Sequence, residues 1–134
     1  MAHRGYNSGV AAYSVNRRVV VTGLGLISPV GLDVPTAWAN LLAGRSGIRP
    51  ITLFDTGAFR VKIAGEAWGF TPTDFMTAKE ARRADRNVQF AIAAARQALA
   101  HAGLAITAAN ADTVGVLIGT GAAGIWTYTA QQKV

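Results

Sequence analysis

Few residues in this chain of 134 amino acids could do chemistry. There is no cysteine, which excludes a thiol nucleophile, a disulfide and a zinc–thiolate site within these residues. The two histidines, His3 and His101, are far apart, and neither has a partner at a spacing typical of catalysis or metal binding. The acidic residues form no fixed pair, and Asp85 is interpreted as an ion-pairing or helix-start residue. We therefore predict no catalytic residue, no metal site and no cofactor in this chain.

A cluster of basic residues is the strongest candidate for binding. Lys79, Arg82 and Arg83 are spaced i, i+3 and i+4, so on a helix they point to one side. Three positive charges on one exposed face could attract an acidic partner. The charge pattern alone favours an ordinary solvated helix face over a binding surface.

The sequence GLGLIS, residues 23–28, invites comparison with a dinucleotide-binding loop. Gly23 and Gly25 have the required spacing, but Ser28 stands where the third glycine belongs and Pro29 follows at once. No acidic residue follows at the end of a convincing second strand. The segment is better interpreted as a tight strand-to-loop turn.

The composition indicates a folded domain and gives no clear sign of binding to nucleic acid or of insertion into a membrane. Hydrophobic residues make up 51% and charged residues 15%, which argues against disorder. The net charge of +6 is spread along the chain without a basic stripe, so we predict no nucleic-acid binding. Residues 113–132 lack formal charge but are rich in glycine and threonine, so we predict no membrane span. Residues 1–16 have no secretory pattern and are predicted to form a flexible tail before a domain at residues 17–134.

Helices are predicted where apolar residues recur at helical spacing between capping signals. Asp33 and Pro35 begin a helix over residues 36–43, whose apolar face carries Ala37, Leu41 and Leu42 beside Trp38, and Gly44 ends it. Thr77 and Glu80 form a capping-box pattern. The clearest helix covers residues 85–102 and ends at Gly103, with many alanines that allow close backbone approach. Its apolar face carries Val88, Ala91, Ile92, Ala95, Leu99 and Ala102, and Arg86, Gln89, Arg96 and Gln97 lie mostly opposite.

Three strands are predicted between these helices. The runs at residues 17–22 and 113–119 are rich in β-branched residues and are expected to be buried on both faces. Residues 59–67 alternate apolar and polar side chains, which is typical of a half-exposed strand. Residues 46–55 are expected to be irregular and partly buried. The order strand, helix, strand, helix, strand predicts an α/β fold with a mostly buried sheet.

Several segments together match one family. They are RRVVVTGLGLISPVG, WANLLAGRSGI, Phe54-Asp55, IAGE, ADRNVQFAIAAARQALAHAGL and VGVLIGTGAAG, in that order. The sequence resembles the amino-terminal part of type II, elongating β-ketoacyl-acyl-carrier-protein synthases. The resemblance covers residue 17 to about residue 126, well under half of a complete family member, so the chain is interpreted as an amino-terminal fragment.

The resemblance implies a thiolase-like fold, of which this chain supplies the early part of the first α/β half. It implies decarboxylative Claisen condensation in fatty-acid chain elongation, an acyltransferase activity in the cytoplasm, with acyl carrier protein as partner and a homodimer when full length. The family's catalytic cysteine, histidines and lysine lie farther along than Val134, so we expect this chain alone to be inactive. The resemblance assigns Lys79, Arg82 and Arg83 to carrier-protein docking, which reverses the expectation from charge alone. It places Ala122 in the acyl pocket, where the family often has a larger aliphatic residue, and Ala123 where it often has glycine.

Three alternatives remain open at this stage. A polyketide ketosynthase shares these early motifs. A non-catalytic chain-length factor shares them as well, with its nucleophile replaced. A basic binding module would share only the charge.

Overall fold

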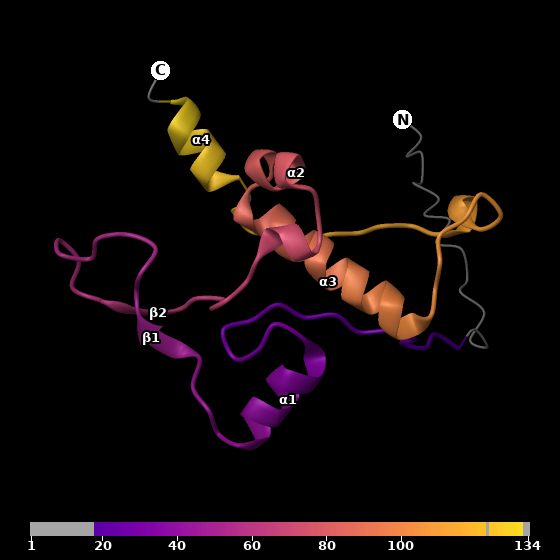
Figure 1. Ribbon diagram of the computed structural model, residues 1–134, viewed down its shortest axis with the longest axis horizontal. Coiled ribbons are helices and arrows are strands. Elements are labelled where there is room, and N and C mark those ends of the chain that lie inside the picture. Colours follow the sequence, from indigo (N-terminus) through magenta and orange to yellow (C-terminus); the bar gives the residue numbers. More distant parts are fainter. Residues whose placement is uncertain (1–17, 123, 133–134) are drawn as a thin grey trace, which may run out of the picture.

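The computed structural model describes residues 18–122 and 124–132 and shows an open arrangement around one long helix (Figure 1). The predicted tail at residues 1–16 and Ala123 lie outside the described residues. Helix α3 (Arg86–Ala102) crosses the centre, with α1 (Val34–Leu42) on one side and α2 (Ala78–Arg83) and α4 (Ile125–Gln131) on the other (Figure 1). The strands are β1 (Ile48–Pro50) and β2 (Ile63–Gly65), and short 3₁₀ turns occur at Pro72–Asp74 and Ala111–Thr113.

Helix α1 begins and ends at its predicted signals. The Asp33 carboxylate accepts a hydrogen bond from the Thr36 N–H at 2.7 Å, which satisfies a free donor of the first turn. Gly44 follows the helix with φ +64°, a conformation that suits glycine. Only Ala37 of the expected apolar face is buried, whereas Trp38, Leu41 and Leu42 are exposed because no described element covers them.

Helix α2 is only six residues long and starts with the predicted capping box. The Thr77 hydroxyl accepts from the Glu80 N–H, and Glu80 Oε2 accepts from the Thr77 N–H at 2.8 Å. The hydrogen bonds from the Thr77 hydroxyl and N–H lower the pKa of Glu80, outweighing a desolvation effect that raises it, and the charge of Arg96 lowers it further. A helix this short depends on such contacts because it is far below the length at which isolated helices persist.

Helix α3 packs its alanines directly against the glycines of GLGLIS. A Cβ atom built on Gly23 would lie 2.1 Å from the Ala98 carbonyl oxygen, and one on Gly25 would lie 1.9 Å from that of Ala94. Both glycines have ordinary negative φ, so the sequence needs them for space rather than for a turn. The chain turns slightly later, where Ser28 and Gly31 exchange backbone hydrogen bonds. The close packing of alanines is confirmed.

The polar side of α3 was predicted wrongly at Gln97. Its amide oxygen accepts from the Leu26 N–H at 3.1 Å, and its amide nitrogen donates to the Leu32 carbonyl at 2.7 Å. His101 Nδ1 likewise accepts from the Leu24 N–H at 3.0 Å. Ala93 is the fully buried residue of this helix, and it was not assigned to the apolar face.

The strands β1 and β2 pair antiparallel, with Arg49 opposite Ala64. Pro29 packs closely against Gly47, just before β1, and Gly65, the last residue of β2. A Cβ built on either glycine would lie 2.7 Å from the proline ring. The half-exposed strand predicted at residues 59–67 is formed only at Ile63–Gly65, and its apolar side chains Phe59, Val61 and Ile63 are exposed instead of forming a buried face. The segment expected to be irregular contains β1.

The two buried strands predicted at residues 17–22 and 113–119 are not formed in the described residues. Neither run has a hydrogen-bonded strand beside it there, and Val19 is 93% and Leu117 is 97% exposed. A buried strand requires neighbours for its backbone groups and both of its faces, and composition alone does not supply them. Residues 25–27 of GLGLIS, residues 117–119 of the second run and residues of α3 line one cavity of about 520 Å³, so GLGLIS and the second run flank the same helix.

None of the helices in the described part of the chain has the length and apolar composition needed to cross a lipid bilayer.

The contact between GLGLIS and α3 predicts that Gly25→Ala is strongly destabilising. Its methyl group would overlap the Ala94 carbonyl, and we expect the free energy of unfolding to fall by about 2 kcal/mol or more. Gly115→Ala is the matched control, because a Cβ there meets nothing within 4 Å. Denaturant unfolding of both variants measures the difference, and equal stabilities would contradict the packing described here.

The capping box predicts an acid-sensitive α2. Because the folded-state pKa of Glu80 lies below the ordinary 4.5, its contribution is complete above pH 4.5 and is lost as the pH falls through the lowered value. An NMR titration of the Glu80 carboxyl and the α2 amides should show both changing together. Thr77→Val should raise the Glu80 pKa toward 4.5, and Glu80→Gln should remove this transition. An unchanged pKa in Thr77→Val would show that the capping box is not its cause.

Candidate functional site

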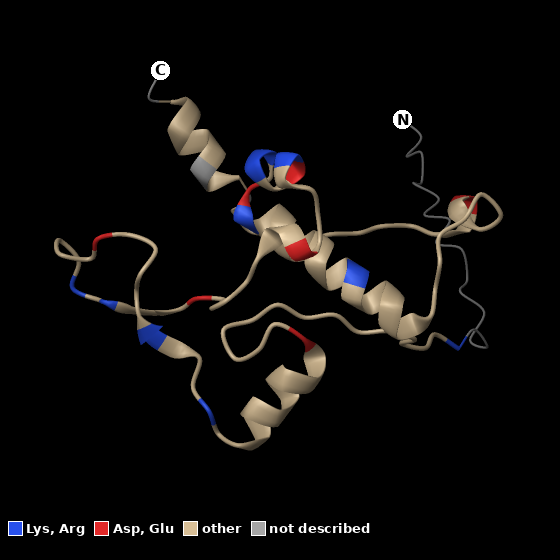
Figure 2. Ribbon diagram, viewed as in Figure 1, with Lys and Arg blue, Asp and Glu red and all other residues tan. Residues whose placement is uncertain are grey.

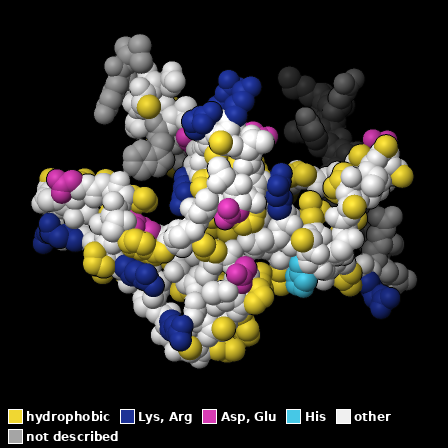
Figure 3. Space-filling view, in the orientation of Figure 1, with side chains coloured by type: hydrophobic (Ala, Val, Ile, Leu, Met, Phe, Trp, Pro, Cys, Tyr) yellow, Lys and Arg dark blue, Asp and Glu magenta, His cyan; other side chains and the backbone are white. Residues whose placement is uncertain are grey.

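The predicted basic face lies on α2, where Lys79, Arg82 and Arg83 are all exposed. Figure 2 shows the basic residues of α2 at the upper edge of the molecule, and Figure 3 shows basic side chains projecting into solvent there. Glu80 is on the same helix, but its carboxylate is turned back onto Thr77. The site therefore presents three unobstructed cations, and the helical spacing predicted from the sequence is confirmed.

Gln89 of α3 holds the carboxyl end of this short helix. Its side-chain amide donates to the Ala81 carbonyl at 2.9 Å and to the Ala84 carbonyl at 3.1 Å. The last carbonyls of a helix have no partner within the helix, so this amide both satisfies them and fixes α2 on α3. Gln89 was predicted only as a polar surface residue.

Arg86 belongs to the same run of basic residues but faces inward. Its guanidinium lies 4.7 Å from the ring centroids of both Phe70 and Phe90, and the two rings meet edge to face at 4.9 Å. Burial lowers the pKa of Arg86, yet an arginine keeps its charge at neutral pH. Arg86 therefore anchors the start of α3 and is not part of the exposed basic face.

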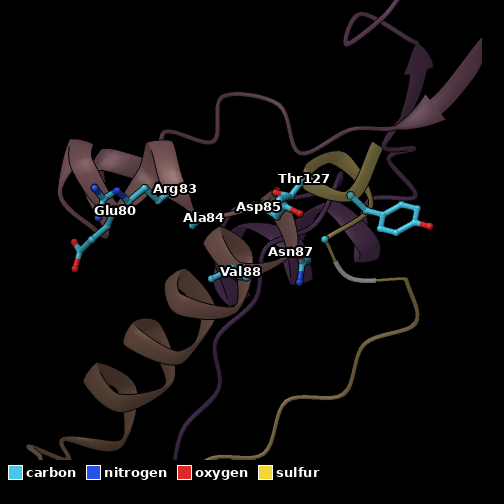
Figure 4. A pocket seen from close by; sticks show the side chains of 9 residues that line it. Glu80, Arg83, Ala84, Asp85, Asn87, Val88 and Thr127 are labelled. Carbon is cyan, nitrogen blue, oxygen red and sulfur yellow. The ribbon is translucent and has the colours of Figure 1, made fainter. Parts of the chain in front are cut away.

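Asp85 links α2 to α3, and its carboxylate has an unexpected partner. It occupies the N-cap position of α3, which confirms the helix-start interpretation, but its side chain makes no capping hydrogen bond. Instead Oδ1 accepts from the Thr127 hydroxyl of α4, 42 positions along the chain (Figure 4). The sequence analysis did not predict α4, and no local pattern indicates that Asp85 and Thr127 form a pair.

A cavity of about 760 Å³ opens beside this contact. It is lined by Glu80, Arg83, Ala84, Asp85, Asn87, Val88, Gly124, Thr127 and Tyr128 (Figure 4). Most of this lining is apolar, with Arg83 contributing a cation at the edge nearest the basic face. Such a cavity can accommodate an apolar group beside a polar one.

Ala122, the proposed acyl-pocket residue, is exposed in the glycine-rich segment 119–124. It precedes Gly124, which has φ +73° and begins α4. The described residues therefore bring the segment carrying Ala122 close to the α2–α3 junction through Asp85 and Thr127.

Two other acidic side chains, Glu66 and Asp55, make separate structural contacts. Burial raises the pKa of Glu66, but hydrogen bonds from the Thr52 N–H, the Thr52 hydroxyl and the Leu53 N–H outweigh it and lower the pKa. Glu66 thereby ties residues 52–53 to the end of β2. Asp55 accepts from the Gly57 N–H in a local turn. Within the described part of the chain, His, Asp and Glu form no group of three that could hold a metal ion.

The GLGLIS loop does not have the geometry of a phosphate site. Phosphate loops place free N–H groups at a helix N-terminus. Here the Leu24 and Leu26 N–H groups are taken by His101 and Gln97, in the carboxyl-terminal half of α3. The tight strand-to-loop turn predicted for these glycines is not formed, because they pack against α3 and the described residues before them form no strand.

Comparison with known proteins gives a consistent result. Residues 16–134 match the family described as "Beta-ketoacyl synthase, N-terminal domain". The chain is 48% identical over 120 residues to a 3-oxoacyl-[acyl-carrier-protein] synthase 2 of Staphylococcus aureus (strain COL), covering 90% of this chain and 29% of that protein. It is 46% identical over 118 residues to the protein of that name from Synechocystis, covering 88% of this chain and 28% of the relative.

A solved structure, "The ishigamide ketosynthase/chain length factor", is similar with a TM-score of 0.62 and 46% identity, over 66% of this chain and 22% of that one. This likeness and the family match confirm the thiolase-like fold predicted from the sequence. The chain spans less than a third of the length of the curated relatives described here. It belongs to the β-ketoacyl synthase family, an acyltransferase family, and matches the N-terminal domain of that family.

Proposed function

We propose that the protein containing this chain is a 3-oxoacyl-[acyl-carrier-protein] synthase that catalyses decarboxylative Claisen condensation in fatty-acid chain elongation. The observation that carries this proposal is the 48% identity to the S. aureus synthase over 90% of the chain. The reaction stores the acyl group on a thiolate, and this chain has no cysteine. The nucleophile must therefore come from outside these 134 residues, and the chain alone should be inactive. Homodimer formation and a cytoplasmic location, both implied by the family resemblance, belong to the same proposal.

Within that protein, α2 is proposed to dock the acyl carrier protein. Lys79, Arg82 and Arg83 are exposed, and Thr77, Glu80 and Gln89 hold the helix that carries them. An acidic carrier would be attracted over a distance comparable to the Debye length and oriented by the three cations. Ala122 is proposed to line the acyl pocket, where its small side chain leaves room for a longer acyl group.

A second candidate is a polyketide ketosynthase or its chain-length-factor partner. The similarity to the ishigamide ketosynthase/chain length factor favours it, at 46% identity. The residue at the family's nucleophile position in the extended reading frame separates a catalytic subunit from a chain-length factor. Incubating the full-length protein with acyl- and malonyl-carrier protein then tests condensation directly, and absence of a 3-oxoacyl product would refute the main proposal.

Charge reversal at α2 tests the docking surface. In the full-length protein, Lys79, Arg82 and Arg83 all changed to Glu should raise KM for acyl carrier protein by about tenfold or more at low salt. The difference should shrink as salt rises, because exposed charges are screened. Arg18, Arg60 and Lys62 changed to Glu form the matched control, since these residues are exposed, lie outside α2 and alter the net charge equally. Equal effects of the two triple variants would assign the loss to net charge rather than to α2.

Ala122→Ile tests the acyl-pocket assignment. A larger side chain should narrow the pocket, so kcat/KM for the longest accepted acyl donor should fall by about tenfold while short donors are little affected. Ala109→Ile, in an exposed turn, serves as the control. The readout is the product chain-length distribution, and an unchanged distribution would remove Ala122 from the pocket.

A further inference from the structure

The Asp85 carboxylate is diverted from the task that its position predicts. Aspartate is among the best N-cap residues because its side chain can accept from an N–H of the first helical turn. Asp85 has the extended backbone of an N-cap, with φ −63° and ψ 160°, yet its side chain makes no such bond. It accepts instead from the Thr127 hydroxyl in the first turn of α4 (Figure 4). Its carboxylate therefore serves a contact between distant segments.

The second oxygen of the Asp85 carboxylate, Oδ2, lies close to Gly124, just before α4. Oδ2 of Asp85 is buried and has no hydrogen-bond partner among the described residues. A Cβ on Gly124 would lie 3.3 Å from this oxygen, and Gly124 has φ +73°. The positive φ therefore favours glycine at this position, and a side chain there would also lie close to the Asp85 carboxylate. The carboxylate consequently contacts the entry to α4 through one hydrogen bond and one close approach.

These contacts join the two sites of the proposed function. Asp85 lies two residues after Arg83, the last residue of the proposed docking helix. Gly124 lies two residues after Ala122, the proposed acyl-pocket residue. The hydrogen bond between Asp85 and Thr127 links these two segments directly.

We propose that Asp85 and Thr127 are positioning residues whose hydrogen bond holds Gly124 and the start of α4 beside the α2–α3 junction, and thereby sets the enzyme's discrimination between acyl chain lengths through the nearby Ala122. This inference rests on the proposed function. The bond restrains a segment that is rich in glycine and otherwise has a wide choice of backbone conformations. Without it, Ala122 would occupy a broader range of positions, and the pocket would distinguish acyl chains less sharply.

The test uses a full-length synthase that carries these residues, such as a chimera in which this chain replaces the matching region of the S. aureus relative. Thr127→Val removes the hydroxyl with little change in volume, and Thr127→Ser retains it. We expect Thr127→Val to reduce the ratio of kcat/KM between preferred and non-preferred acyl lengths by about threefold or more, with Thr127→Ser restoring it. KM for the carrier protein should stay within about twofold, since the α2 charges are untouched.

Asp85→Ala provides an independent second variant, and Asp112→Asn, at an exposed site, is its control. The double variant Asp85→Ala/Thr127→Val should lose no more discrimination than either single variant. Each single variant and the double variant lack the same Asp85–Thr127 hydrogen bond. A uniform fall for every acyl length would show a merely structural role and overturn the inference. If the parent enzyme is active and its Thr127→Val and Asp85→Ala variants discriminate as well as it does, the inference is also overturned, while the proposed function still stands. A parent without condensation activity would overturn both.

Discussion

The close approach of the extended segment 23–26 to helix α3 is the contact on which the rest of the structure depends. It places two glycine backbones against the carbonyls of Ala94 and Ala98, at distances where any side chain would overlap. Gln97 and His101 then satisfy the N–H groups that this approach brings next to the helix. Gln97 also bonds the Leu32 carbonyl, so the same helix positions the entry to α1. One helix thus organises segments that are 65 to 77 positions away in sequence.

The parts of the fold that the sequence predicts are those determined within three or four residues. The Asp33 cap and the Thr77–Glu80 capping box depend on side chains next to the backbone groups that they satisfy. The glycines after α1 and α3 depend only on their own positive φ. The positions of α1 and α3 were therefore predicted to within about two residues, whereas α4 was not predicted. Strands are different, because a β-branched run becomes a strand only when another strand supplies its hydrogen bonds. The valines at 19–21 form no strand in the described residues and are exposed.

The candidate site likewise contains features that the local sequence predicts and contacts between distant residues that it does not. The spacing of Lys79, Arg82 and Arg83 fixes their common direction once a helix forms, so the sequence suffices to predict a cationic face. Asp85 and Thr127 meet across 42 positions, and neither residue type nor local pattern identifies the pair. Gln89 and Gln97 show the same limit. A polar residue on a helix is predicted to face solvent, and only the packed structure shows that a carbonyl or an N–H group lies within hydrogen-bonding distance of it.

The basic face also illustrates how a short helix can carry a recognition surface. Six residues cannot sustain a helix by propensity, since nucleation costs more than so few hydrogen bonds return. Here both ends are held by side chains, Thr77 and Glu80 at the start and Gln89 from α3 at the end. Because none of these groups is one of the three exposed cations, the charges remain available to a partner. The helix geometry and the charge of the surface are therefore set by different residues, and each can be altered without removing the other.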